Sequence, residues 1–210
     1  MSEFIIIGGG GHARVVISIL RKLKGSSVLG YSDYIDHGTV MGAPYLGPDS
    51  SLPSIISESR WPDAVLAVGQ VGLGQPRQDL WDRLVAHALH FPRILSIDAI
   101  VNDGVTGGEG AVIMDGAVIN CGVTLGRGVI VNTNSTIEHD TVLGDWVHVA
   151  PAATVCGDAT IGPYSMIGAG ATVIEGKKIT TRCVVGAGAT VIHDLTEPGV
   201  YVGCPARRIK

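Results

Sequence analysis

His139 and Asp140 stand side by side at the end of the stretch Asn-Thr-Asn-Ser-Thr-Ile-Glu-His-Asp, residues 132–140. Histidine is the side chain whose ordinary pKa lies closest to neutrality, so it can take a proton from a nucleophile at physiological pH. A neighbouring carboxylate can orient the imidazole and raise its basicity. The pair therefore predicts a general base with a supporting acid, and an ordinary surface histidine is the alternative.

A glycine run near the N-terminus indicates a second kind of chemistry, the binding of phosphate. Residues 5–7 are apolar, residues 8–11 are glycines, and residues 14–20 are mainly apolar, which is typical of a buried strand, a tight turn and a helix. Gly10 and Gly11 would then place backbone N–H groups at the start of the helix, where anions bind.

The same turn fits a dinucleotide-binding fingerprint. Gly8, Gly10 and Ala13 match Gly-x-Gly-x-x-Ala, and Asp33 stands at the end of the next expected strand. A domain of about 95 residues has room for one nucleotide-binding half of such a fold. We therefore expect a nucleotide diphosphate here, with Asp33 accepting a hydrogen bond from the ribose or the base.

The composition restricts the class of protein. Of 210 residues 30 are glycine, while 46% are hydrophobic and 5% aromatic, which favours many short strands and tight turns over a helical bundle. The net charge is −4 and no cluster of Lys or Arg stands out, so nucleic acid and anionic membranes are not expected as partners.

Cysteine usage and the N-terminal residues favour the cytoplasm. The four cysteines are far apart and form no Cys-x-x-Cys pair, which predicts reduced thiols and neither a metal site nor a redox pair. Residues 2–7 combine an acidic residue with a short apolar run, unlike a signal peptide or a membrane span.

Residues 1–95 are expected to form a small α/β domain with a mainly parallel sheet. Further strands are predicted over residues 28–31, ending at Ser32 and Asp33, and over residues 64–68, ending at Gly69. Apolar residues recur at helical spacing between residues 76 and 90.

From residue 101 to residue 191 an aliphatic residue recurs at every sixth position, and only Gly107 interrupts the frame. Two positions earlier stands a small or β-branched residue, with Lys177 as the clear exception, as inward alternation in a short strand requires. Three positions later glycine is frequent, for example at Gly104 and Gly188, where a corner needs a positive φ. Each unit of six is thus a strand and a corner, and stacked units predict a solenoid rather than a sandwich with coincidental spacing.

This frame resembles the hexapeptide-repeat acyltransferases, whose left-handed β-helix has three units in each coil. Residues 203–207, Gly-Cys-Pro-Ala-Arg, resemble the Gly-x-Pro-Ala-Lys/Arg ending of such enzymes. An N-terminal βα domain ahead of an uninterrupted helix is similar to the PglD/NeuD/PerB group of sugar acetyltransferases, and the likeness covers essentially the whole chain. It implies a Rossmann-like half domain in residues 1–95 and a left-handed parallel β-helix with a C-terminal tail in residues 96–210.

The resemblance implies transfer of acetyl from acetyl-CoA to the amine of a nucleotide-linked amino-deoxy sugar, of the UDP-4-amino-4,6-dideoxy or GDP-perosamine type. Residues 132–140 match the family motif Asn-Thr-x-Ser-x-Ile-Glu-His-Glu/Asp, so His139 would be the base, Asp140 its partner and Asn132 a substrate contact. One coil of 18 residues beyond His139 is Gly157, whose backbone N–H would hold the oxyanion. No metal is implied.

The resemblance also assigns contacts to the coenzyme and to the sugar nucleotide. The coenzyme contacts would be His148, Gly157, Ala169 and Ala187. The substrate contacts in the first domain would be Gly10, Gly11, His12, Ser32, Asp33 and Gly69.

His148 and His139 point in opposite directions within one chain, because they stand half a coil apart in the frame. Both can serve one site only if neighbouring chains contribute one each. We therefore expect a homotrimer, which is the family's state.

Four other readings remain open on the sequence. A sialic acid or other sugar O-acetyltransferase would share the architecture and the base. Serine acetyltransferase fits less well because no helical N-terminal domain is evident, and a γ-type carbonic anhydrase would need three histidines converging on zinc. A non-enzymatic scaffold or NAD(H) sensor would use the helix for assembly alone.

Overall fold

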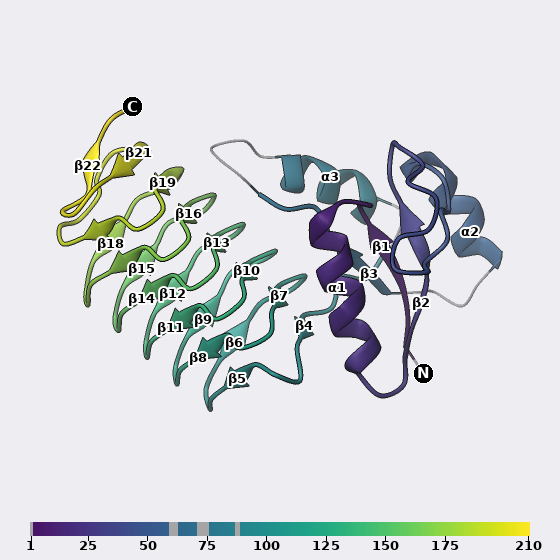
Figure 1. The fold of residues 1–210 in the computed structure, drawn as a ribbon, viewed down its shortest axis with the longest axis horizontal. Coiled ribbons are helices and arrows are strands. Elements are labelled where there is room, and N and C mark those ends of the chain that lie inside the picture. Colours follow the sequence, from purple (N-terminus) through teal and green to yellow (C-terminus); the bar gives the residue numbers. More distant parts are fainter. Residues whose placement is uncertain (1, 59–62, 71–75, 87–88) are drawn as a thin grey trace. The chain divides into compact units, whose positions relative to one another are not determined.

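The computed structural model describes residues 2–58, 63–70, 76–86 and 89–210. The chain divides into two compact units, drawn as a ribbon in Figure 1. The first unit comprises Met1–Gly69 and Pro76–Ile97, and the second comprises Gln70–Gln75 and Asp98–Lys210. The sequence pattern predicts a boundary after residue 95.

The first unit contains a three-stranded parallel sheet in the order β2-β1-β3, formed by β1 (Ser2–Ile7), β2 (Ser26–Ser32) and β3 (Asp63–Leu66). Its helices are α1 (Gly11–Lys22), the 3-10 helix η1 (Asp49–Ser51), α2 (Leu52–Glu58) and α3 (Pro76–Val85). The three strands, α1 and α3 were expected from the sequence. The helix expected between residues 76 and 90 corresponds to α3. Residues 87 and 88 of that expected range lie outside the described residues.

Burial explains why β1 and α1 form the centre of this unit. Ile5, Ile6 and Ile7 are almost fully buried, and so are Val16 and Leu20 on one side of α1. Removing each such side chain from water contributes about 1.5–3 kcal/mol. The sheet and α1 therefore hold the glycine loop between them, residues 8–10, in a fixed place.

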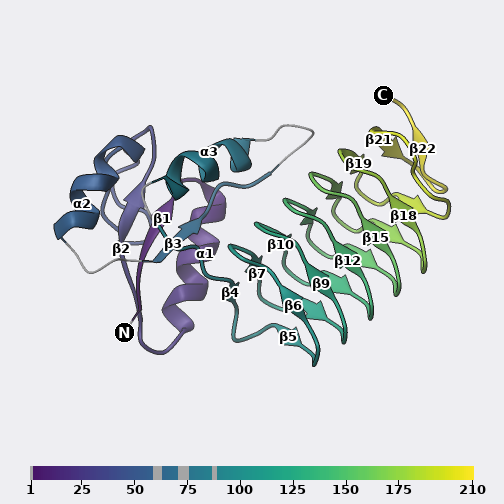
Figure 2. The same cartoon turned by 180° about the vertical axis from the view of Figure 1, so that it is seen from behind.

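The second unit is a left-handed parallel β-helix whose coils carry three sheets, seen from two sides in Figures 1 and 2. One sheet contains β5 (Ile100–Val101), β8 (Val118–Ile119), β11 (Thr136–Ile137), β14 (Thr154–Val155), β17 (Thr172–Val173) and β20 (Thr190–Val191). A second contains β6 (Thr106–Gly107), β9 (Thr124–Leu125), β12 (Val142–Leu143), β15 (Thr160–Ile161) and β18 (Lys178–Ile179). The third contains β7 (Val112–Ile113), β10 (Ile130–Val131), β13 (His148–Val149), β16 (Met166–Ile167), β19 (Cys183–Val185), β21 (Gly199–Val202) and β22 (Arg207–Arg208). The short strand β4 (Ile94–Leu95) precedes the coils.

The repeat of six residues builds the core of this helix. Ile137 is paired with Ile119 on one side and Val155 on the other, and all three are buried. Strands one coil apart are therefore in register, and the inward aliphatic residues stack in columns. The expectation of inward aliphatic residues is confirmed.

The corners of the helix adopt the left-handed backbone conformation that the glycine spacing predicted. Gly104 has φ 75° and Gly188 has φ 67°. Seven residues with side chains adopt a positive φ in the same frame: Asn134, Asp140, Trp146, Ala152, Asp158, Tyr164 and Arg182. Asp140 thus reaches its place through a backbone conformation that costs an ordinary residue roughly 1–2 kcal/mol.

The last coil departs from the frame. Ile179 is bridged to Leu195, and Cys183 is paired with Gly199, so this coil has 16 residues between paired positions. Leu195 and Tyr201 close the end of the core and are nearly buried. The tail then turns back, because β22 runs antiparallel to β21.

Candidate active site

His139 and Asp140 form a hydrogen-bonded pair on the corner that follows β11. Nδ1 of His139 lies 2.9 Å from Oδ2 of Asp140. Because a carboxylate accepts, Nδ1 donates to Asp140 and Nε2 is the ring nitrogen left for a reactant. The side chains are 56% and 68% exposed, so Nε2 is open to a reactant. This geometry suits a general base whose ring is oriented by a carboxylate.

Two glycines make room for this pair in the neighbouring coils. A Cβ at Gly157 would lie 2.7 Å from Nε2 of His139, and a Cβ at Gly122 would lie 2.6 Å from Oδ1 of Asp140. Gly157, unlike Gly122, does not have a positive φ. The glycine at 157 is therefore needed for space beside the imidazole and not for turning the corner.

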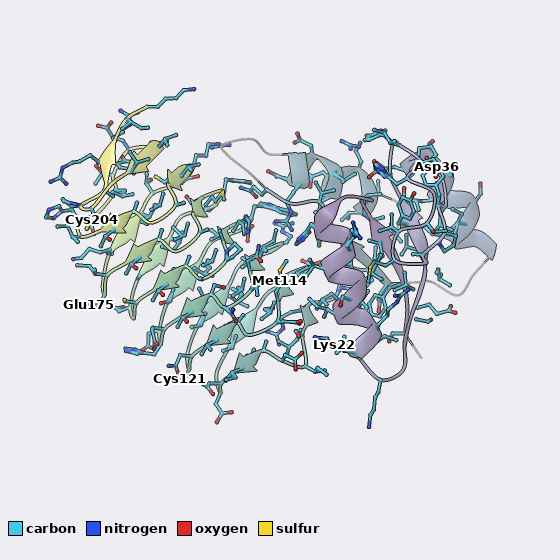
Figure 3. The ribbon with its side chains drawn as sticks, in the orientation of Figure 1. Lys22, Asp36, Met114, Cys121, Glu175 and Cys204 are labelled. Atoms are coloured by element: carbon cyan, nitrogen blue, oxygen red, sulfur yellow. The ribbon has the colours of Figure 1, made fainter. Side chains whose placement is uncertain are left out.

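The backbone N–H of Gly157 is a hydrogen-bond donor available to a negatively charged group. Among the described residues it has no hydrogen-bond acceptor, whereas its carbonyl accepts from the N–H of Gly176 at 2.9 Å. Figure 3 labels Cys121 and Glu175, which occupy the same edge one coil before His139 and one coil after Gly157. His139 and this N–H donor thus occupy adjacent coils, an arrangement suited to a general base beside an oxyanion donor.

A ladder of polar side chains, which the sequence patterns did not single out, leads up to this corner. Nδ2 of Asn102 donates to Oδ1 of Asn120 at 3.1 Å, and Nδ2 of Asn120 donates to Oε2 of Glu138 at 2.9 Å. The three residues stand one coil apart at the same position of the frame, which is the signal that could have revealed them. Glu138 is thereby fixed beside His139 with its carboxylate towards the preceding coil.

Cys156, the residue before Gly157, is not suited to carry an acetyl group. Burial raises the pKa of the Cys156 thiol, and the carboxylates of Glu175 and Glu138 raise it further. A thiol must ionise to attack a thioester. An acyl intermediate on Cys156 is therefore not expected.

His148 lies in a different environment, on β13 in another sheet of the helix. Its Nδ1 is 2.9 Å from the carbonyl oxygen of Gln70, and its Nε2 is 3.1 Å from Nδ2 of Asn132. A carbonyl can only accept, so Nδ1 carries the proton and Nε2 accepts from the asparagine amide. The imidazole is neutral and 7% exposed. Asn132, expected as a substrate contact, lies against His148 in this structure.

The structure distributes the expected site residues over two edges of the helix. His139, Asp140 and Gly157 come together after β11 and β14. Ala169 and Ala187 are exposed on the corners after β16 and β19, in the sheet that contains His148. The N–H of Gly188 donates to the carbonyl oxygen of Ala169 at 2.9 Å, so these two corners stack directly. Within one chain the two groups stand on different edges.

In the first unit, the glycine loop leaves its backbone accessible. A Cβ added at Gly10 or Gly11 would meet no described atom outside the adjacent backbone within 4 Å, and α1 begins at Gly11 without a side-chain cap. Oδ2 of Asp33 accepts from the N–H of Gly9 at 2.6 Å, so this carboxylate also braces the loop. His12 stands in the first turn of α1 beside Gly69. An anion could approach the N-terminus of this helix.

A cavity of about 410 Å³ opens beside this loop, within the first unit. Ser32 and Asp33, which the resemblance predicts as substrate contacts, line it, and so do Tyr34, Asp49 and Arg83. The sequence patterns did not indicate Asp49 or Arg83. Asp49 precedes α2 and Arg83 lies on α3, and no motif links the two. The described residues contain no group of three or more His, Cys, Asp or Glu placed to hold a metal ion.

The chain is similar to several known proteins. A family model described as the PglD N-terminal domain matches residues 3–81. The acetyltransferase domain of PglB from Neisseria gonorrhoeae FA1090, solved with acetyl coenzyme A, is 31% identical over 99% of this chain and 98% of its own, with a TM-score of 0.89. PerB from Caulobacter crescentus, solved with CoA and GDP-perosamine, is 33% identical over 100% of this chain and 98% of its own, with a TM-score of 0.92.

A more distant solved structure shares the fold alone. WeeI from Acinetobacter baumannii AYE is 23% identical over the full length of both chains, with a TM-score of 0.87. A search of curated proteins found no match. No helix within the described ranges is long and apolar enough to cross a membrane. The identity and full coverage of PglB and PerB show that the chain belongs to the PglD/PerB family of sugar acetyltransferases, enzymes that take their acetyl group from acetyl coenzyme A.

Proposed function

We propose that this enzyme acetylates the amine of a nucleotide-linked amino-deoxy sugar, with His139 as general base. The observation that carries the proposal is the corner where Nε2 of His139, oriented by Asp140, lies against Gly157. Substrates of the UDP-4-amino-4,6-dideoxy or GDP-perosamine type remain the candidates, and the GDP-perosamine bound to PerB supports this class.

The proposed reaction is a direct attack. The neutral amine nitrogen bonds to the thioester carbon, its proton passes to Nε2 of His139, and the carbonyl electrons move to oxygen. The N–H of Gly157 donates to that oxyanion. When the carbonyl re-forms, the C–S bond breaks and the imidazolium returns the proton to the departing thiolate of coenzyme A. Asp140 stays ionised and stabilises the imidazolium between the two steps.

The proposed active unit is a homotrimer in the cytoplasm. His139 and Gly157 stand on one edge, whereas Ala169, Ala187 and His148 belong to another edge and its sheet. One coenzyme can contact both sets only if it lies between two chains, and cyclic symmetry repeats such a site. Because both ring nitrogens of His148 have partners inside the chain, we propose that this ring shapes the wall of the coenzyme site. The four free cysteines suit a reducing compartment.

The test is release of coenzyme A from acetyl-CoA with a panel of acceptors. The panel pairs each nucleotide-linked amino sugar with its hydroxyl counterpart at the same carbon, and adds free sialic acid. We expect release only with an amine, and a product that resists hydroxylamine because it is an amide. Release with hydroxyl acceptors, giving a hydroxylamine-labile ester, would establish the O-acetyltransferase instead.

A further inference from the structure

The carbonyl group of Cys156 belongs to the same peptide unit as the N–H of Gly157, the proposed oxyanion donor. This carbonyl oxygen accepts a hydrogen bond from Oγ1 of Thr141 at 3.2 Å. Thr141 is fully buried in the β-helix, so the carbonyl points into the core. The peptide is trans, and in a planar trans peptide the C=O and N–H groups point in opposite directions. The N–H of Gly157 is therefore directed out of the core, towards the surface where the imidazole of His139 lies against this glycine.

The hydroxyl of Thr141 takes the place of a backbone hydrogen bond that is present at another corner. After β13, the N–H of Ala153 donates to the carbonyl oxygen of Ala150 at 3.1 Å and closes the turn. Ala159 and Cys156 occupy the same two places after β14, but the N–H of Ala159 does not donate to the carbonyl oxygen of Cys156. Among the described residues, Thr141 supplies the donor instead. The orientation of this peptide thus depends on a side chain and not on the turn itself.

A threonine is not needed at position 141 for packing. The same inward place is occupied by Val123 one coil earlier and by Ala159 one coil later, and both are fully buried in the apolar core. Burying a hydroxyl costs free energy unless it is hydrogen-bonded. A valine has nearly the same shape and no such cost, so packing alone does not account for the hydroxyl of Thr141. Its hydrogen bond to Cys156 gives the hydroxyl a purpose.

We propose that Thr141 is a positioning residue for acetyl transfer, whose hydroxyl fixes the peptide between Cys156 and Gly157 so that the N–H stays aimed at the oxyanion. A hydrogen bond to the carbonyl of a peptide polarises the group and makes its N–H a stronger donor. A donor that is already in place needs no reorganisation when the negative charge develops. This inference rests on the proposed function, because it concerns how the proposed oxyanion donor is held.

The experiment compares Thr141→Val and Thr141→Ser in the full-length protein by steady-state kinetics and thermal melts. Thr141→Val keeps the shape and removes the hydroxyl, so kcat should fall by about 10- to 100-fold, a part of the roughly 10²–10³-fold that loss of an oxyanion donor costs. The KM for acetyl-CoA should hardly change, because the interaction is made only in the transition state. Thr141→Ser keeps the hydroxyl and loses a buried methyl group, so it should retain most of the natural kcat although its melting temperature falls. Activity should therefore follow the hydroxyl and not the stability.

Ser165→Ala is the matched control, because Ser165 makes the same kind of bond at a different corner. Its Oγ donates to the carbonyl oxygen of Thr180 at 3.1 Å, and both bonds join residues 15 positions apart. Ser165 is also fully buried, and the corner after β18 contains no proposed catalytic group. Ser165→Ala should lower the melting temperature and leave kcat unchanged.

Three outcomes would overturn the role of Thr141. The first is a natural kcat in Thr141→Val, and the second is an equal loss of kcat in Thr141→Ser and Thr141→Val. The third is a loss of kcat in Ser165→Ala as large as that in Thr141→Val, because the effect would then be common to buried hydroxyls of the β-helix.

The proposed function and this inference fail in different ways. Loss of turnover in His139→Ala together with natural turnover in Thr141→Val would leave the proposed function standing and remove the role of Thr141. Release of coenzyme A with hydroxyl acceptors alone would overturn the amine acceptor but not Thr141, because transfer to a hydroxyl passes through the same oxyanion and the same variants decide the question on those acceptors. Absence of release with every acceptor would overturn both.

Discussion

The imidazole of His139 lies against Gly157 of the next coil, so closely that a Cβ at 157 would stand 2.7 Å from Nε2. This contact brings the basic nitrogen next to the backbone N–H that we propose as the oxyanion donor. The absence of a side chain at 157 is also what allows the imidazole of His139 to lie this close to the next coil. The contact therefore makes a side chain at 157 a test of base position.

Gly157→Ala should lower kcat by about 100-fold while leaving the fold intact, because the added methyl displaces a ring that is more than half exposed and can swing away. In a His139→Ala background, Gly157→Ala should not lower kcat further, since the imidazole with which the methyl group would clash is absent. Steady-state kinetics and thermal melts of the four proteins give the comparison. Glu175→Gln, one coil further on, is the control for disturbing this edge. An alanine at 157 with full turnover would show that the contact is irrelevant.

His139→Ala should lose about 10²–10⁴-fold in kcat, because it removes the proposed base. Asp140→Asn should lose less, since an amide oxygen can still accept from Nδ1–H but no longer balances the imidazolium charge. Asp158→Asn is the matched control, an aspartate at the same position one coil on with the same left-handed backbone. Kinetics at saturating acetyl-CoA separate the three. Equal losses in Asp140→Asn and Asp158→Asn would contradict the dyad.

Asn132→Ala should destabilise the fold by about 1–3 kcal/mol, because it removes the hydrogen bond from the Asn132 amide to the buried ring of His148. Urea unfolding measures the free energy change. Asn102→Ala is the comparison, since that asparagine is exposed and does not have a positive φ. If Asn132→Ala is as stable as the natural protein, the hydrogen bond between Asn132 and His148 does not stabilise the fold. A direct contact between Asn132 and the substrate would then be favoured.

Mixed chains test the proposed site between neighbours. His139→Ala removes the base, and Ala187→Trp blocks the exposed coenzyme edge without touching the core. After unfolding and refolding together in equal amounts, about one site in four should pair a native His139 edge with a native Ala187 edge, because each is present with probability one half. Activity should thus return to about a quarter of the natural value. Mixtures as inactive as either parent, or an active monomer in sedimentation, would rule out the shared site.

The sequence by itself determined the β-helix and the location of the corner that we propose as catalytic. A period of six residues is local information, because every inward aliphatic residue and every corner glycine obeys the same rule in each coil. The pairing of Ile137 with Val155 and the positive φ at Gly104 follow directly from it. His139 and Asp140 are adjacent in the chain, so their hydrogen bond needed no tertiary information. The glycine loop and α1 could likewise be predicted, because they form one continuous segment of the sequence.

Tertiary structure alone decided the relationships between distant residues. The spacing could place Gly157 above His139, but only the coordinates distinguish a glycine needed for space from one needed for its backbone angle. His148 is tied to Gln70, which stands 78 residues earlier and outside the repeat. Asp49 and Arg83 meet in one cavity although they come from a short 3-10 helix and from α3. Such contacts depend on how irregular loops pack. Irregular loops have no sequence repeat that predicts which residues will be neighbours in space.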